Sequence, residues 1–190
     1  RLMTVEYLKK ATKTSASDAS DVTKIVQGIL NDIEAGGEDA CLKFRDQFDQ
    51  YDGNVVLTAE EIQAACDQVP EKLKRDIQFA HANVKRFADS LRSNFVDTEI
   101  AVIPGLIAGQ KAIPCNAAGC YAPGGRYAHI ASALMTVTTA KVAGCQNIVA
   151  CSPPRAGVGI HPAIVYTAHI CGADHIVALG GVQGIAAMAF

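Results

Sequence analysis

The chain has 190 residues, 49% of them apolar, with seven cysteines and a formal net charge of −2 at pH 7. This composition supplies a real core for one domain or two small ones, and the near-neutral charge argues against nucleic acid as the main partner. The sequence has no apolar run of the roughly 18–20 residues that a membrane helix needs. Residues 1–20 are polar and do not form a signal peptide, and the odd number of cysteines does not suit a disulfide framework. We therefore expect a cytoplasmic protein without a membrane partner.

The composition changes near residue 96. Residues 1–95 carry 29 of the 36 charged side chains, and residues 96–190 carry the other seven. The first part therefore predicts helices with one solvated face, and the second predicts elements buried on most sides, as in a parallel α/β sheet. The expected fold is α/β, with a helical segment at 1–95 that packs against another domain or subunit. The first part of a Rossmann-like NAD-binding domain, truncated at its C-terminus, follows at 96–190.

The first two predicted helices lie on either side of a glycine pair. Asp21 can cap a helix whose apolar residues recur every three or four positions until Gly36 and Gly37 end it. A second helix is expected at about 38–48. A turn then leads into a short strand at about 55–57.

Two further helices have clear starting signals. Thr58 and Glu61 form a capping-box pattern for a helix that runs to about residue 68. Pro70 suits the first turn of a long helix that carries a single apolar stripe. The stripe consists of Leu73, Ile77, Ala80, Val84, Phe87, Leu91 and Phe95. A helix of this length is expected to pack across a second domain or a second subunit.

The second part alternates strands with helices. Apolar runs around Pro104 and Gly105 predict a β-hairpin over about 99–113. Buried strands are then expected at 117–122, 147–151 and 174–179, and helices at 131–143, 161–171 and 182–190. The alternation predicts a right-handed parallel sheet.

Two of these strands end in a glycine pair, at Gly124-Gly125 and at Gly180-Gly181. Both ends are expected at the carboxyl edge of the sheet, where open α/β proteins bind ligands. The segment from Pro123 into the next helix can bring backbone N–H groups to an anionic or dinucleotide ligand, although a plain turn is the alternative. It lacks the G-x-G-x-x-G pattern, so it does not by itself indicate ordinary Rossmann dinucleotide binding.

Five sequence blocks occur in order and at close intervals in the second part. They are YAPGGR at 121–126, LMT at 134–136, TAKVAG at 139–144, SPP at 152–154 and LGGVQGIAA at 179–187. Together they resemble the N-terminal half of the histidinol dehydrogenase family. The resemblance is weak in the first ninety residues and strong from Gly119 onward.

The resemblance implies a zinc-requiring, NAD-dependent dehydrogenase. Such an enzyme oxidises a small polar primary alcohol through the aldehyde to the carboxylate by two hydride transfers at one site. Family members are homodimers with intertwined protomers, which suits the long striped helix. In the family, the tyrosine before Pro-Gly-Gly and the glutamine of Gly-Gly-x-Gln contact NAD. In this chain the matching residues are Tyr121 and Gln183. Pro123, Gly124 and Gly125 complete the expected cofactor-binding set. A half-buried strand end and a polar helix cap are the structural alternatives for Tyr121 and Gln183.

The resemblance places the zinc ligands and the catalytic Glu-His pair after Phe190, so no catalytic or metal-binding residue is assigned. The residues themselves agree, because His161, His169 and His175 lack the i, i+4 spacing of a helical metal pair. The cysteines likewise form no C-x-x-C knuckle. We therefore expect a piece of a longer protein, and a catalytically inert NAD-binding and dimerisation fragment is the alternative.

The stretch after Pro-Gly-Gly departs from the pattern of histidinol-oxidising members. Those members usually carry a proline-containing, hydroxyl-rich segment, whereas this chain has RYAHIAS at 126–132. Val182 and Gly184 flank the glutamine where alanines are common. These features resemble the branch that oxidises sulfopropanediol, so histidinol and sulfopropanediol are the two candidate alcohols. Arg126 could steer an anionic substrate or cofactor phosphate, or it is an exposed loop arginine.

Overall fold

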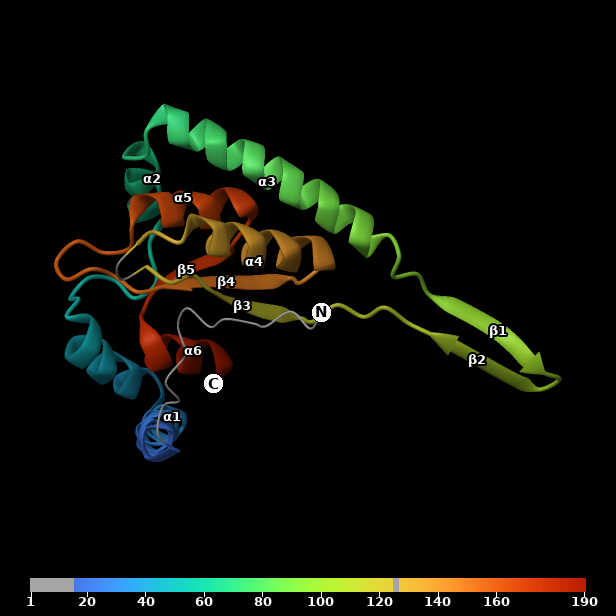
Figure 1. Cartoon of the computed structure of the whole chain (residues 1–190), viewed down its shortest axis with the longest axis horizontal. Helices are drawn as coiled ribbons and strands as arrows, with labels where there is room; N and C mark the ends of the chain where they lie inside the picture. The colour runs from blue at the N-terminus through green and yellow to red at the C-terminus, as the bar shows by residue number, and fades with distance from the viewer. Residues whose placement is uncertain (1–15, 125–126) are drawn as a thin grey trace, which may run out of the picture.

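The computed structural model describes residues 16–124 and 127–190. Its elements in chain order are α1 (Ala16–Phe44), the π-helical turn η1 (Arg45–Asp49), α2 (Ala59–Asp67), α3 (Glu71–Arg92), β1 (Thr98–Ile103), β2 (Leu106–Gln110), β3 (Ala117–Tyr121), α4 (Ile130–Ala143), β4 (Asn147–Ser152), α5 (Pro162–Cys171), β5 (His175–Ala178) and α6 (Gly181–Ala189) (Figure 1). The predicted α/β class is confirmed.

Strands β3, β4 and β5 form a parallel sheet in that order. In its register Tyr121 lies opposite Cys151, and Ser152 lies opposite Ala178. Helices α4 and α5 cover one face, with α3 and α2 packed outside them, while α6 lies against the other face and α1 packs on α6 (Figure 1). Because all three strands run the same way, their carboxyl ends meet at one edge of the sheet.

The main core lies between the sheet and helices α4 and α5. Val137, Ile148 and Ile164 are fully buried there, and Ile77 of α3 closes the outer side. Burying each of these side chains contributes about 1.5–3 kcal/mol relative to exposure. The interior therefore rests on the short apolar runs that the sequence marks as strands and buried helices.

The N-terminal region agrees with expectation at its glycine pair and differs at the expected strand. Gly37 has a non-helical backbone conformation (φ 55°, ψ −134°) that divides α1 into two helical segments, as the glycine pair predicts. The strand expected at 55–57 is wrong, because only Val56 forms an isolated antiparallel bridge, with Val177. Backbone hydrogen bonds from Leu57 to Ile176 and from Ala178 to Val55 hold this segment on the outer edge of β5.

The apolar stripe of α3 is buried in its first half and solvated in its second. Ile77 is 3% exposed, whereas Phe87 is 67% exposed. The predicted hairpin is confirmed as antiparallel β1 and β2, which extend well away from the body and are exposed along their whole length (Figure 1). Large apolar side chains are exposed on the end of α3 and on the hairpin, and we call this region the hairpin surface. Its members are Phe87, Leu91, Phe95, Ile100, Val102 and Ile107, with Ile107 on the opposite face of the hairpin from Ile100 and Val102.

The capping box at α2 gives a test of the local fold. The Thr58 hydroxyl accepts from the Glu61 N–H (3.2 Å), and the Glu61 carboxylate accepts from the Thr58 N–H (2.8 Å). We expect Thr58→Ala to lower the free energy of unfolding by about 1 kcal/mol, because one helix donor loses its acceptor. Chemical denaturation measures the change. Ser90→Ala, at an exposed position in the last turn of α3, is the control, and equal losses in both variants would contradict this role.

Candidate functional site

The carboxyl ends of β3 and β5 lie at the same edge of the sheet and touch each other. The Gly181 N–H donates to the Tyr121 hydroxyl at 3.1 Å, across 60 residues of sequence. Strand β4 runs between them and ends at Ser152. The structure thus brings together Tyr121 and the second glycine pair.

Tyr121 is half-buried at the end of β3. Burial is the main cause that raises the pKa of its phenol, and the hydrogen bond from Gly181 opposes this effect. The phenol therefore stays protonated at neutral pH and retains a proton that it can donate. Its ring helps to line an apolar groove of about 470 Å³, whose other walls are Val26, Leu30, Gly181, Val182 and Ile185. Such a groove suits one face of a flat ring.

The first glycine loop packs closely over the end of β4. Pro123 is exposed and Gly124 is buried. A Cβ on Gly124 would lie 2.8 Å from the Ser152 Oγ, so the close approach requires glycine. Ser152 is itself buried, and its hydroxyl has no hydrogen-bond partner among the described residues. Gly125, the remaining member of the predicted set, and Arg126 lie outside the described residues.

Gln183 is only 3% exposed and is held by a residue from the N-terminal region. Its Nε2 donates to the Asp49 Oδ2 at 3.0 Å, and the Gly180 N–H donates to the same oxygen at 3.0 Å. The sequence analysis missed Asp49, which ends η1 and is more than 130 residues away in the chain. No short-range pattern marks it, because its partners are set by the tertiary fold.

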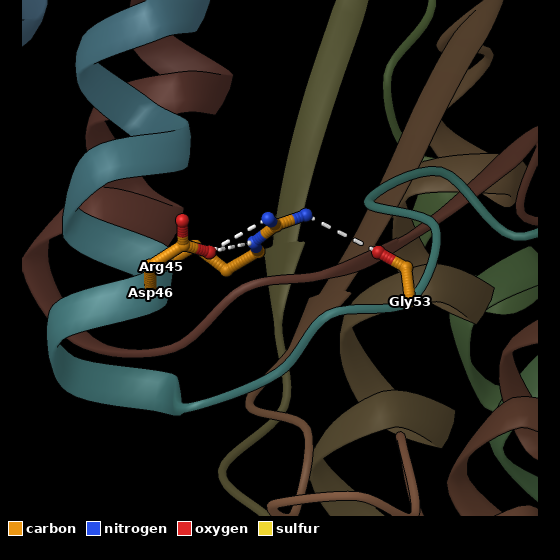
Figure 2. A network of polar contacts seen from close by, with 3 residues as sticks. All are labelled: Arg45, Asp46 and Gly53. Atoms are coloured by element: carbon orange, nitrogen blue, oxygen red, sulfur yellow. Dashed lines mark hydrogen bonds and ion pairs between the residues drawn. The ribbon is translucent and has the colours of Figure 1, made fainter.

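Arg45 fixes the turn that follows Asp49. Its guanidinium donates to the Asp46 carboxylate through Nε (2.9 Å) and Nη2 (2.6 Å), and to the Gly53 carbonyl through Nη1 (3.2 Å) (Figure 2). Gln50 adopts a left-handed conformation (φ 49°) and its N–H returns to the Arg45 carbonyl. These bonds end the first helical region so that Asp49 reaches the sheet edge.

The other titratable groups near this edge are inert or structurally occupied. The Cys151 thiol donates to the Leu179 carbonyl, and burial raises its pKa to about 12, so the nucleophilic thiolate does not form near neutral pH. His161 Nδ1 accepts from the Ala163 N–H at 3.1 Å, and burial lowers the pKa of the ring. Within residues 16–124 and 127–190, no cluster of three or more His, Cys, Asp or Glu side chains could hold a metal ion.

The comparisons with known proteins identify the family. The histidinol dehydrogenase family model matches residues 12–190. The chain belongs to the histidinol dehydrogenase family. The resemblance carried by the five sequence blocks is therefore confirmed.

Relatives at two levels of similarity match nearly the whole chain. It is 66% identical over 188 residues to a sulfopropanediol 3-dehydrogenase from Ruegeria pomeroyi, covering 99% of this chain and 43% of that protein. It is 35% identical over 177 residues to a histidinol dehydrogenase from Methanosarcina mazei, covering 92% of this chain and 40% of that protein. The chain thus spans less than half the length of the curated relatives it matches.

A solved structure agrees with the fold. The crystal structure of histidinol dehydrogenase from Elizabethkingia anophelis matches with a TM-score of 0.83 at 32% identity, covering 96% of this chain and 41% of that one. This similarity agrees with the α/β class seen in our chain. In the part that the structure describes, no helix is long and apolar enough to cross a membrane.

Gly180 provides a test of the contact between Asp49 and the second glycine pair. Its φ of −105° suits any residue, but a Cβ there would overlap the Asp49 Oδ1 and lie 3.0 Å from the Pro153 Cβ. We expect Gly180→Ala to displace Asp49 and to lower the unfolding free energy by about 1–3 kcal/mol, measured by thermal denaturation. Gly28→Ala, in the exposed interior of α1 with open space around it, is the control and should be neutral or stabilising. An unchanged melting temperature in Gly180→Ala would refute this packing.

Proposed function

We propose that the chain is the cofactor-binding, N-terminal part of an NAD-dependent, zinc-requiring dehydrogenase in the cytoplasm. The enzyme oxidises a small polar primary alcohol through the aldehyde to the carboxylate by two hydride transfers. The observation that carries this proposal is the 66% identity to a sulfopropanediol 3-dehydrogenase. Identity to a named histidinol dehydrogenase is 35%, so we favour sulfopropanediol, oxidised to sulfolactate, over histidinol, oxidised to histidine. Seven free cysteines, six of them buried, support a reducing compartment.

The carboxyl edge of the sheet is the proposed NAD site. Tyr121, Pro123, Gly124, Gly125 and Gln183 form its cofactor-binding set. Tyr121 would support a flat ring with its face and donate its phenol proton, while the glycines let the cofactor backbone approach closely. NAD, when bound, accepts the hydride. The chain's own contribution is to bind and orient the dinucleotide at the ends of β3 and β5.

The residues described here do not fit the zinc site. The reaction needs a base that takes the alcohol proton and a metal that polarises the oxygen. Among the described side chains, no group of three or more His, Cys, Asp or Glu residues could hold the metal ion. The relatives are more than twice as long as this chain, and we assign both functions to sequence outside it.

The hairpin surface supports a homodimer. Its apolar side chains lie on the end of α3 and on an arm that extends beyond the body (Figure 1). Exposed large apolar side chains gathered in one region are typical of protein–protein interfaces. We propose that a second copy of the chain covers it.

The lack of a metal-binding cluster among the described residues also favours a second candidate. In this alternative, the 190 residues bind NAD and dimerise without turnover. Incubation of the chain itself with NAD, zinc and alcohol separates the two, because any turnover rules out the inert fragment.

Activity of the complete protein tests the proposed function. We expect the protein, supplied with zinc and NAD, to form two NADH per sulfopropanediol and to use histidinol poorly, as followed by NADH absorbance. Removal of zinc by a chelator should abolish turnover but leave NAD binding intact, as measured by calorimetry. Formation of no NADH with any polar primary alcohol would refute the proposal.

The oligomeric state tests the hairpin surface. We expect Leu91→Glu to convert a dimer into monomers, because it places a charge in a desolvated apolar contact. Sedimentation velocity measures the mass. Phe79→Glu changes an exposed aromatic residue of α3 outside the stripe and should leave the dimer intact. A wild-type protein that stays monomeric at high concentration would refute the dimer.

A further inference from the structure

Asp49 makes contacts that a simple surface carboxylate does not make. Its Oδ2 accepts from both the Gly180 N–H and the Gln183 Nε2, each at 3.0 Å. The residue is half-buried and comes from η1, whereas both partners belong to the loop between β5 and α6. One carboxylate oxygen therefore joins the first helical region to the proposed cofactor loop.

The carboxylate fixes the orientation of the Gln183 amide. An ionised carboxylate only accepts hydrogen bonds, so the amide must direct its nitrogen toward Asp49 and its oxygen elsewhere. The Gln183 Oε1 lies beside Gly181, 3.2 Å from the position that a Cβ on that glycine would occupy. The Gly181 N–H in turn donates to the Tyr121 hydroxyl. Among the hydrogen bonds of the described residues, none reaches this Oε1.

We propose that Asp49 is a positioning residue for the cofactor. By holding the nitrogen of Gln183, it presents the Gln183 Oε1 as a hydrogen-bond acceptor on the Tyr121 side of the loop. The matching group on a nicotinamide dinucleotide is a donor, either a ribose hydroxyl or the carboxamide NH₂. This role rests on the proposed function, because it requires that NAD bind at this edge.

A purely structural role for Asp49 makes different predictions. Gly180 gives α6 no side-chain cap, and a carboxylate at a helix N-terminus is itself stabilising. Asp49→Asn keeps an oxygen for the Gly180 N–H, but its amide can also donate, so the Gln183 amide is free to turn over. A cap role therefore affects stability, whereas a positioning role affects NAD affinity through Gln183.

The test measures NAD binding by calorimetry, and the KM values for NAD and alcohol, on the complete protein. We expect Asp49→Asn to weaken NAD binding and to raise its KM about tenfold, with little change in the KM for the alcohol. In a Gln183→Ala background, Asp49→Asn should have no further effect on NAD affinity. The control is Asp76→Asn on α3, whose exposed carboxylate pairs with Lys72, and it should keep wild-type NAD affinity.

Exchanging the amide and the carboxylate between positions 49 and 183 provides a second test, which does not rely on the single variant Asp49→Asn. Gln183→Glu places two carboxylates together and should lose NAD affinity. Combining it with Asp49→Asn restores a donor facing an acceptor at unchanged net charge, and should recover most of the affinity. Recovery supports the proposal, and its absence overturns it.

A cofactor analogue distinguishes the two donors. The 3-acetylpyridine analogue of NAD keeps the ring carbonyl but lacks the NH₂ group. If the carboxamide is the donor, Gln183→Ala removes the preference of the wild type for NAD over the analogue. If a ribose hydroxyl is the donor, Gln183→Ala weakens both equally. Either result supports the acceptor role of Gln183.

Failure of the positioning role can be separated from failure of the proposed function. If the wild type binds NAD and the folded Asp49→Asn variant binds it with the same affinity, Asp49 is a helix cap only. The same conclusion follows if the losses of NAD affinity from Asp49→Asn and Gln183→Ala add up in the double variant. Failure of the wild-type protein to bind NAD would refute the proposed function, and the positioning role with it.

Discussion

The hydrogen bond between the Gly181 N–H and the Tyr121 hydroxyl joins the two strand ends on which the candidate site is built. It is possible only because β3, β4 and β5 are parallel and in order, which brings their carboxyl ends to one edge. The outer strands are separated by β4, so a long side chain is needed to reach from one to the other. Tyr121 supplies that length, and its ring remains at the wall of the apolar groove.

Contacts from the N-terminal region complete this edge. Asp49 binds the loop after β5, Val56 bridges to β5, and α2 and α3 pack on α5 and α4. The charge contrast near residue 96 therefore reflects which faces are solvated. It does not mean that the two parts fold without contact, since residues before 96 hold the second glycine pair in place.

Local signals account for most of the elements that the sequence predicts. The capping box at Thr58 is present where the sequence predicts it, and the glycines Gly144 and Gly172 end α4 and α5 in the left-handed conformation. These helix caps depend on neighbours within a few residues, so they can be predicted from one sequence alone.

The features that the sequence does not reveal depend on distant partners. Val56 pairs with Val177 of β5 through an isolated antiparallel bridge. Gln183 is buried because Asp49 reaches it from more than 130 residues away, and Gly180 is a glycine because of that same carboxylate. The five sequence blocks located the family and the edge, while the cofactor roles of Tyr121, Pro123, Gly124, Gly125 and Gln183 remain predictions.

The β1–β2 arm has a consequence for the dynamics of the molecule. Every residue of both strands is exposed, so the ladder between Thr98 and Gln110 is shielded by no packed side chains within the described chain. A two-stranded ribbon is only marginally stable by itself in water. In an isolated protomer the amide hydrogens of this arm therefore exchange with solvent faster than those of β4, and a second surface that covers the arm would slow this exchange.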